Sequence, residues 1–245
     1  LKQEERVAVN LNLEGGDIHF AGDILVQKLN VKADSLTNAD VIVTAASATF
    51  EGNDKLNIGK DLALNVNAYE VIVKNGGDVV TLNDVNADDT EFDITADGTV
   101  TLTSVSTMMG TVEADTLDIE GAKIAGFDTK IANLTVNNVS DSAEITNDGD
   151  LNILKSTLNG DLSVIADNIT IDWTTVSAGS LALQGGEITL TDAIVAATSG
   201  NAEFTGDVKA DGQVIISADQ AVLLNGNLEG GNDVRIITDE LELNG

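Results

Sequence analysis

Several residue types are missing or scarce in this chain of 245 residues. There is no cysteine, which excludes disulfides and thiolate metal sites. Basic residues are few: 12 Lys and Arg stand against 41 Asp and Glu, which gives a formal net charge of −29. This charge excludes ordinary nucleic-acid binding through phosphates and disfavours adsorption to anionic lipid. No apolar run reaches the roughly eighteen residues of a membrane-spanning helix, so no transmembrane segment is expected.

What the chain does contain is a repeat of about twenty residues. Apolar residues recur at the same offsets after Gly160, Gly179, Gly212 and Asn232. The residues at offsets plus two and plus four are Leu162, Leu181, Val214, Val234 and Val164, Leu183, Ile216, Ile236. We expect these eight side chains to point inward and to form two aliphatic columns, one for each offset.

The alternation of apolar and polar residues inside each unit is typical of a strand with one buried face. Its phase breaks at Gly, Asn, Asp and Ser residues, which favour turns. Each unit therefore reads as three short strands, and a coil of this size must stack on its neighbours to bury its apolar face. The prediction is an all-β fold, a right-handed parallel β-helix (β-solenoid), forming one segment over residues 1–245. Proline is absent, as such a stack of backbone hydrogen bonds requires.

Some parts of the chain fit this repeat less well. Residues 105–148 are strand-like but do not fall on the offsets. The stretches 149–159 and 200–211 are half as long as a unit, so they are either short coils or units whose third strand is replaced by a loop. The chain begins at Leu1 without an apolar leader, and it ends at Gly245 within the repeat. We therefore expect it to be part of a longer rod or fibre.

The unit Gly160–Ile171, with Gly179–Leu190 and Gly212–Leu223 close to it, has the form Gly-x-Leu-x-Leu-x-Ala-x-x-Ile-x-Leu. This unit resembles the repeat of filamentous haemagglutinin-type exoproteins, the large adhesins of two-partner secretion systems. The resemblance is good over 149–245, patchy over 22–104 and poor between them. It implies a secreted or surface-tethered β-helix that acts in adhesion, biofilm matrix or cell contact.

The densest group of acids contains Asp84, Asp88, Asp89 and Asp93. Hard cations take several carboxylate and carbonyl oxygens, so these four residues are candidate ligands for Ca²⁺. The alternative is a solvated acidic face on a rod that is acidic everywhere. No other cofactor is expected.

No catalytic residue is assigned, and we expect that the chain is not an enzyme. The segment Asn86–Asp89 is faintly similar to the acid pairs of pectin-cleaving β-helix enzymes, but the basic and histidine motifs of those enzymes are missing. His19 is the one histidine, and it lies between Ile18 and Phe20 on a strand where it would point to solvent.

Trp173 and Tyr69 are the large amphipathic aromatics of the chain, and either side chain is able to stack on a sugar ring. Because Trp173 follows a strand at a corner, packing or capping is the favoured interpretation. The threonines at 99–103 and at 189–191 form two isolated runs rather than one continuous array.

The leading hypothesis is a structural or adhesive rod, secreted or on a bacterial cell surface, whose host-cell, matrix or glycan receptor the sequence does not identify. Self-association of the rod, end to end or side by side, is part of this hypothesis. The alternatives are a calcium-dependent carbohydrate-binding module and a β-helix enzyme that degrades polysaccharides.

Overall fold

The computed structural model describes residues 10–21, 24–38, 41–45, 47–58, 62–66, 71–75, 79–83, 91–96, 98–103, 107–231 and 233–245. All regular structure in these residues is β-strand. The described residues therefore contain no helix that is long and apolar enough to cross a membrane. The strands of the first half are β1 (Asn10–Phe20), β2 (Ile24–Leu25), β3 (Lys28–Asn38), β4 (Val41–Ala45), β5 (Ser47–Ile58), β6 (Leu62–Val66), β7 (Val71–Asn75), β8 (Val79–Asn83), β9 (Glu91–Ala96), β10 (Thr99–Thr103), β11 (Thr107–Glu113) and β12 (Thr116–Lys130). Those of the second half are β13 (Asn133–Asn147), β14 (Leu151–Ile153), β15 (Ser156–Thr157), β16 (Asp161–Ile165), β17 (Asn168–Asp172), β18 (Thr175–Ala178), β19 (Leu181–Thr191), β20 (Ile194–Ala197), β21 (Ala202–Asp211), β22 (Gln213–Ala218), β23 (Ala221–Asn225), β24 (Leu228–Gly230), β25 (Asp233–Ile237) and β26 (Glu240–Leu243).

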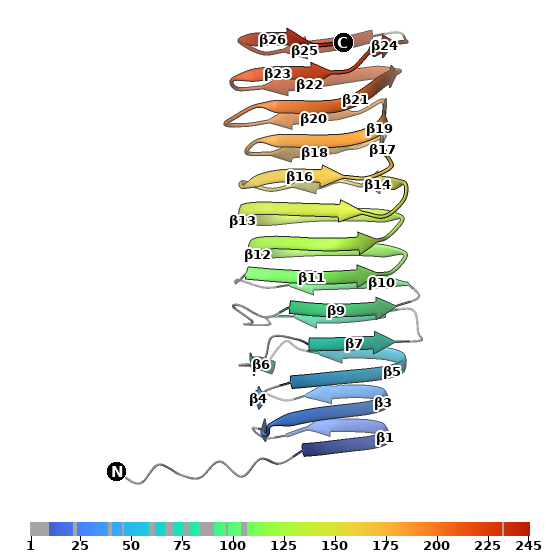
Figure 1. The fold of residues 1–245 in the computed structure, drawn as a ribbon, viewed down its shortest axis with the longest axis vertical. Helices are drawn as coiled ribbons and strands as arrows, with labels where there is room; N and C mark the ends of the chain where they lie inside the picture. Colours follow the sequence, from blue (N-terminus) through green and yellow to red (C-terminus); the bar gives the residue numbers. More distant parts are fainter. Residues whose placement is uncertain are drawn as a thin grey trace, which may run out of the picture.

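The strands pair in parallel with the strands of the next coil, which makes the molecule a β-solenoid (Figure 1). One coil has three faces, which we name after the strands β16 (face A), β17 (face B) and β18 (face C). Where a corner is shallow, one strand runs across two faces, as in β19 and β21, which cover faces A and B. The predicted all-β fold of stacked parallel coils is confirmed, while its right-handed winding and its extent as a single segment stay predictions.

An uninterrupted row of paired residues runs along face A from the first coil to the last. The row consists of Leu11, Leu29, Ala48, Val71, Phe92, Gly110, Phe127, Ile145, Val164, Leu183, Phe204, Leu224 and Leu243. The spacing along the chain varies, from 17 residues between Gly110 and Phe127 to 23 residues between Ala48 and Val71. The residues of this row therefore stay aligned from coil to coil, and the differences in coil length are accommodated at the corners.

The core is a continuous aliphatic column with a few aromatic rings, and Phe50, Phe92 and Phe204 are its largest fully buried side chains. Six of the eight predicted core residues are buried, and the other two, Val234 and Ile236, are half-buried against the core. Each buried Leu, Ile or Val stabilises the fold by about 1.5–3 kcal/mol relative to an exposed one.

The predicted arrangement of these residues in two columns is wrong. Leu162 pairs with Leu181 on face A, and Leu181 pairs next with Ala202. Val214 pairs with Val234, but this pair lies on face C. The same division separates Val164 and Leu183 on face A from Ile216 and Ile236 on face C. The eight residues therefore belong to four different rows on two faces, and one of these is the long face A row.

The reason is that two different corners of the coil begin with the same sequence pattern. Gly160 and Gly179 lie at the corner from face C to face A, between β15 and β16 and between β18 and β19. Gly212 instead lies at the corner from face B to face C, between β21 and β22. Both corners are followed by an outward residue and then by alternating apolar residues. The offset from a glycine therefore identifies an inward position without identifying its face.

The stretches that did not fit the repeat are ordinary parts of the stack. Residues 202–211 form β21, which covers faces A and B of a complete coil whose face C is β22. Residues 151–157 contain β14 and β15, which are faces B and C of a coil whose face A lies in β13. The two strands with 15 residues, β12 and β13, fall in the region of weakest repeat and pair along most of their length.

Candidate interaction surfaces

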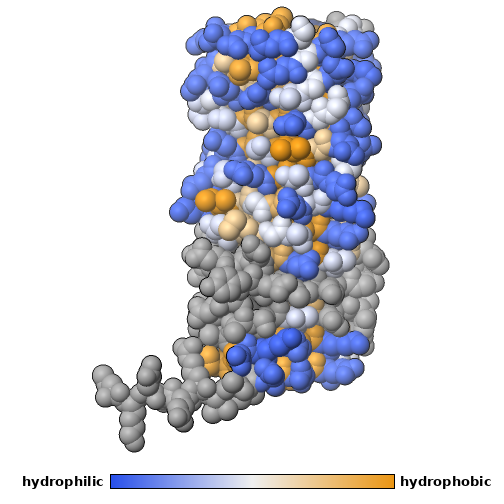
Figure 2. Space-filling view, in the orientation of Figure 1, coloured by the Kyte–Doolittle hydropathy of each residue, from blue (hydrophilic) through white to orange (hydrophobic). Residues whose placement is uncertain are grey.

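A shallow groove crosses the outer side of face A at β9, β11 and β12. It has a volume of ≈ 520 Å³ and extends to the end of β13. Acids and threonines make up most of its lining, together with Lys130, Asn147, Ile94 and Val112. Lys130 Nζ lies 3.3 Å from Glu113 Oε1, and both side chains are exposed. In Figure 2, which shows the side of the molecule with face A, hydrophilic residues gather along the edges of the described surface, and a less polar band lies between them. An open groove of this kind can contact an extended ligand but does not enclose one.

Asp93, one of the four candidate calcium ligands, lies in this groove on β9. Its carboxylate Oδ1 accepts a hydrogen bond of 2.8 Å from Thr111 Oγ1 on the next coil. Asp84, Asp88 and Asp89 lie outside the described residues. Within the described part of the chain no three His, Cys, Asp or Glu side chains come together as a metal-binding group. The calcium site therefore stays a prediction.

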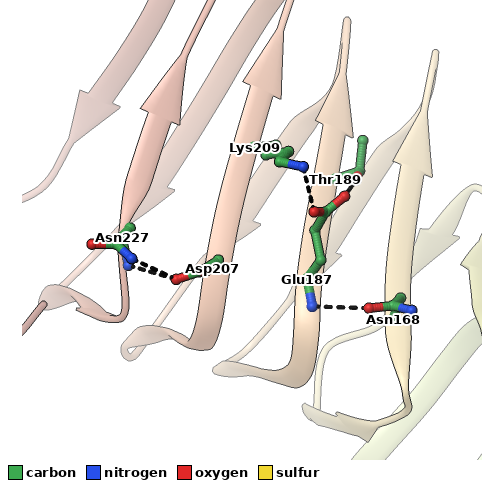
Figure 3. A network of polar contacts seen from close by, with 6 residues as sticks. All are labelled: Asn168, Glu187, Thr189, Asp207, Lys209 and Asn227. Atoms are coloured by element: carbon green, nitrogen blue, oxygen red, sulfur yellow. Dashed lines mark hydrogen bonds and ion pairs between the residues drawn. The ribbon is translucent and has the colours of Figure 1, made fainter.

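Polar side chains form a ladder at the corner between faces A and B (Figure 3). Asn168 Oδ1 accepts a hydrogen bond of 3.0 Å from the backbone N–H of Glu187 one coil further on. Glu187 forms an ion pair of 2.5 Å with Lys209 on the coil beyond. Asp207 Oδ1 accepts hydrogen bonds from both the backbone N–H and the side-chain amide of Asn227, at 3.1 and 2.9 Å. These contacts join β17, β19 and β21 to one another and to Asn227, the residue before β24, so the ladder stabilises the stack.

The ion pair shifts the pKa of both partners. The hydrogen bond from Lys209 holds the pKa of Glu187 below its ordinary value of 4.5, and partial desolvation opposes this effect. The hydrogen bond to Glu187 raises the pKa of Lys209 above 10.5. Both side chains are largely exposed, so this pair is a surface contact rather than a site for acid-base chemistry.

The outer side of face B joins the two threonine runs that looked separate in the sequence. One outward column contains Thr99, Thr116, Asn133, Asn152, Thr170 and Thr189, and it continues in Lys209 and Glu229. Two of its steps are linked by hydrogen bonds, at 3.4 Å from Asn133 to Thr116 and at 3.3 Å from Asn152 to Asn133. The adjacent outward column contains Asp118 and Asp172. Face B is therefore a polar surface with interspersed acids and not a uniform threonine array.

Trp173 lies at the corner between faces B and C, and 76% of its side chain is exposed. The packing interpretation made from the sequence is therefore wrong. Its backbone has a φ of 50°, in the left-handed region, and Asp192 and Gly212 take similar values of 46° and 71° in the next two coils. The backbone N–H of Trp173 donates a hydrogen bond of 2.9 Å to the carbonyl of Thr191. A bulky residue rarely adopts this conformation, and here the corner holds the indole away from the core. Tyr69 lies outside the described residues.

Sequence reasoning missed three buried polar side chains, Thr129, Asn147 and Ser156. Asn147 Oδ1 accepts hydrogen bonds of 2.9 Å from Thr129 Oγ1 and from the backbone N–H of Ile131. Asn147 Nδ2 donates to the carbonyl of Ile131 at 3.2 Å. Ser156 Oγ accepts a hydrogen bond of 3.0 Å from the N–H of Val136. The detectable signal was an asparagine two residues after Ile145, at a position where the alternation expects an inward side chain.

The sequence placed His19 on the solvent side of its strand, and the structure agrees: the side chain is exposed on β1, between half-buried Ile18 and buried Phe20. The segment Asn86–Asp89 lies outside the described residues. The prediction that the chain is not an enzyme therefore stays a prediction.

Comparison of the chain with models of protein families, with curated proteins and with solved structures gives no match. The structure is compatible with a β-helix repeat protein, and the filamentous haemagglutinin-type resemblance rests on the repeat unit itself.

Proposed function

We propose that this chain is a rod segment of a bacterial exoprotein, secreted or on the cell surface, that acts as a structural or adhesive element. The observation that carries the proposal is the row of paired residues from Leu11 to Leu243 on face A. A rod held by continuous backbone ladders resists bending, since any bend must open hydrogen bonds on one side of the stack. Such a rod suits a protein that must span a distance between a cell and a contact surface.

The charge of the chain supports an extracellular spacer. A net charge of −29 keeps the rod soluble and repels anionic surfaces at long range. The absence of cysteine means that stability does not depend on oxidation. The coil stack supplies stability in place of disulfides.

The adhesive part of the proposal is tested by the retention of beads coated with the purified chain. The test surfaces are cell monolayers and polysaccharide films, and free chain serves as the competitor. Retention that free chain abolishes is the expected result. Beads coated with the variant Leu183→Asp, whose coil stack is disrupted, serve as the control and should lose retention. Beads with the intact chain that are never retained would contradict the adhesive role.

The structural part of the proposal has a separate test. Small-angle X-ray scattering on the dissolved chain should show a rod of roughly 60 Å, because about a dozen coils stack at about 4.8 Å each. A compact or strongly bent particle would contradict a rigid spacer, whatever the beads show.

A further inference from the structure

The outer side of face C differs from the other two faces in its second half. Two outward columns run along it between residues 175 and 237. One consists of Thr175, Ile194, Ile215 and Arg235, and the other of Ser177, Ala196, Ser217 and Ile237. We name these eight residues the face C strip. None of them is acidic, although the chain contains 41 acids.

The face C strip is apolar at its centre and exposed. Ile194 is 41% exposed and Ile237 is 43% exposed, and half-buried Ile215 lies between their coils. Trp173, with its left-handed backbone, lies at the border of the strip in the coil of Thr175. A tryptophan and an arginine beside exposed isoleucines fit an interface core, where aromatic residues and Arg are enriched.

Acidic side chains border the strip on both sides. Asp192 and Asp211 lie at the corner with face B, and Asp219 and Asp239 lie at the corner with face A. Exposed Asp233, the first residue of β25, lies at the face B end of the strip, two residues before Arg235. The outer sides of faces A and B carry acids within their columns, such as Glu144 on face A. The strip is thus a surface on which a second acidic rod can approach without carboxylates meeting at the centre of the contact.

We propose that two copies of this chain pair side by side and antiparallel through the face C strip. A two-fold axis parallel to the strands, midway between the coils of Ile194 and Ile215, makes the strip complementary to itself. Ile194 of one copy then faces the coil of Ile215 in the other, and the reverse holds by symmetry. Such an isologous contact closes after two copies.

The same axis brings the two ends of the strip together. The coil of Trp173 and the coil of Arg235 are three steps apart, about 14 Å at the usual coil spacing. The two-fold operation places Thr175 directly opposite Arg235 of the second copy, with Trp173 two residues further along the same coil, at the level of Asp233. The long side chain of Arg235 can extend along the strand to the indole. Arg235 is exposed and forms no ion pair with a residue that the structure describes. A guanidinium over an indole is a favourable cation–π pair, and each dimer contains two of them.

The acidic borders predict how salt affects the dimer. In this arrangement the corner acids of one copy face those of the other, and their repulsion is screened within a Debye length of about 8 Å at physiological ionic strength. Salt therefore strengthens the association, whereas a contact made of salt bridges would weaken. The proposal does not require an adhesive role, since it concerns the surface of the rod alone.

Sedimentation velocity on the full chain, from low to high micromolar concentration and at two ionic strengths, tests the proposal. We expect a monomer–dimer equilibrium that shifts toward the dimer at the higher ionic strength. Trp173 is the one tryptophan of the chain, so its fluorescence reports directly on the strip. Its emission should shift to the blue as the dimer forms.

Two variants locate the contact. Ile194→Asp on face C should abolish the dimer, whereas Ile165→Asp on face A should leave it intact. The two isoleucines are a matched pair, since each is 41% exposed on a strand. Trp173→Ala should weaken the dimer about tenfold or more.

Three results would overturn the proposal: a chain that stays monomeric under all these conditions, a dimer that survives Ile194→Asp, or a dimer that Ile165→Asp abolishes equally. The bead and scattering experiments are made on the isolated rod, so their failure would leave this result unchanged.

Discussion

The corner between faces A and B is built in two different ways along the rod. In the coils of β12 and β13 it is held by side-chain hydrogen bonds: Thr129 donates to Asn147, and Asn147 bonds both the N–H and the carbonyl of Ile131. From Gly185 onward the same corner is a stack of glycines. A Cβ on Gly206 would lie 1.8 Å from the carbonyl oxygen of Gly185. In the coils of β12 and β13 a side-chain amide therefore holds this corner together. From Gly185 onward the backbones of successive coils approach each other directly at the same corner.

The position of each row is therefore fixed by the stack, whereas the structure of the corner differs from coil to coil. The 17-residue coil from Gly110 to Phe127 and the 21-residue coil from Leu183 to Phe204 occupy the same row. Removing a row position should therefore cost more stability than altering either corner. The corners in turn should respond to different substitutions.

The largest effect is expected from the row itself. Leu183 is 1% exposed, between Val164 and Phe204, so Leu183→Asp places a carboxylate without a partner in the core. The cost should be several kcal/mol, measured by urea unfolding. Gln184→Asp is the control on the adjacent outward position, and it should change stability by less than about 0.5 kcal/mol. Equal losses for the two variants would show that the row is not the element that holds the coils together.

The sequence contained enough to predict these rows but not their faces. The alternation of apolar and polar residues identifies Leu183 and Ile216 as inward, because successive side chains of a strand point to opposite sides of the sheet. Which of the three faces a residue occupies depends on the number of residues in each corner. Gly160 and Gly212 begin different corners with the same sequence pattern. The exposure of Trp173 was not predictable for a related reason, since it follows from a left-handed backbone conformation that a tryptophan rarely takes.

The amide corner should show the next largest effect. Asn147→Ala removes both the acceptor for the N–H of Ile131 and the donor to its carbonyl, at a residue that is 5% exposed. The loss should be about 2–4 kcal/mol. Hydrogen exchange at the amide of Ile131 should quicken in the same variant. Asn152→Ala removes an exposed amide from the face B column and should cost much less. A small loss for Asn147→Ala would mean that the backbone closes this corner unaided.

The glycine corner should be broken by a single methyl group. Gly206→Ala forces a Cβ against the backbone of Gly185, at a φ of 125° that is unfavourable for alanine, and should cost at least about 2 kcal/mol. Gly149→Ala separates the two causes. Its φ of 111° is similarly unfavourable, but a Cβ there has no atom within 4 Å. It should cost about 1 kcal/mol, measured as a shift of the urea midpoint. Identical losses would assign the whole effect to backbone strain and none to close stacking.

The smallest effect is expected at the surface of the same corner, from the ion pair of Glu187 with Lys209. Because the folded pKa of Glu187 lies below 4.5, the pair contributes stability above pH 4.5 and loses it as the pH falls through the lowered value. On the alkaline side the raised pKa of Lys209 means that the contribution is present below pH 10.5 and is lost as the pH rises through the raised value. Glu187→Gln should therefore lower the melting temperature slightly at neutral pH and make no difference well below pH 4.5. Glu144→Gln, which removes an exposed acid from face A, should have the opposite sign at neutral pH because it relieves repulsion in a chain of net charge −29. If both substitutions raised the melting temperature at neutral pH, general repulsion would outweigh the ion pair, and this corner would be closed by its glycines alone.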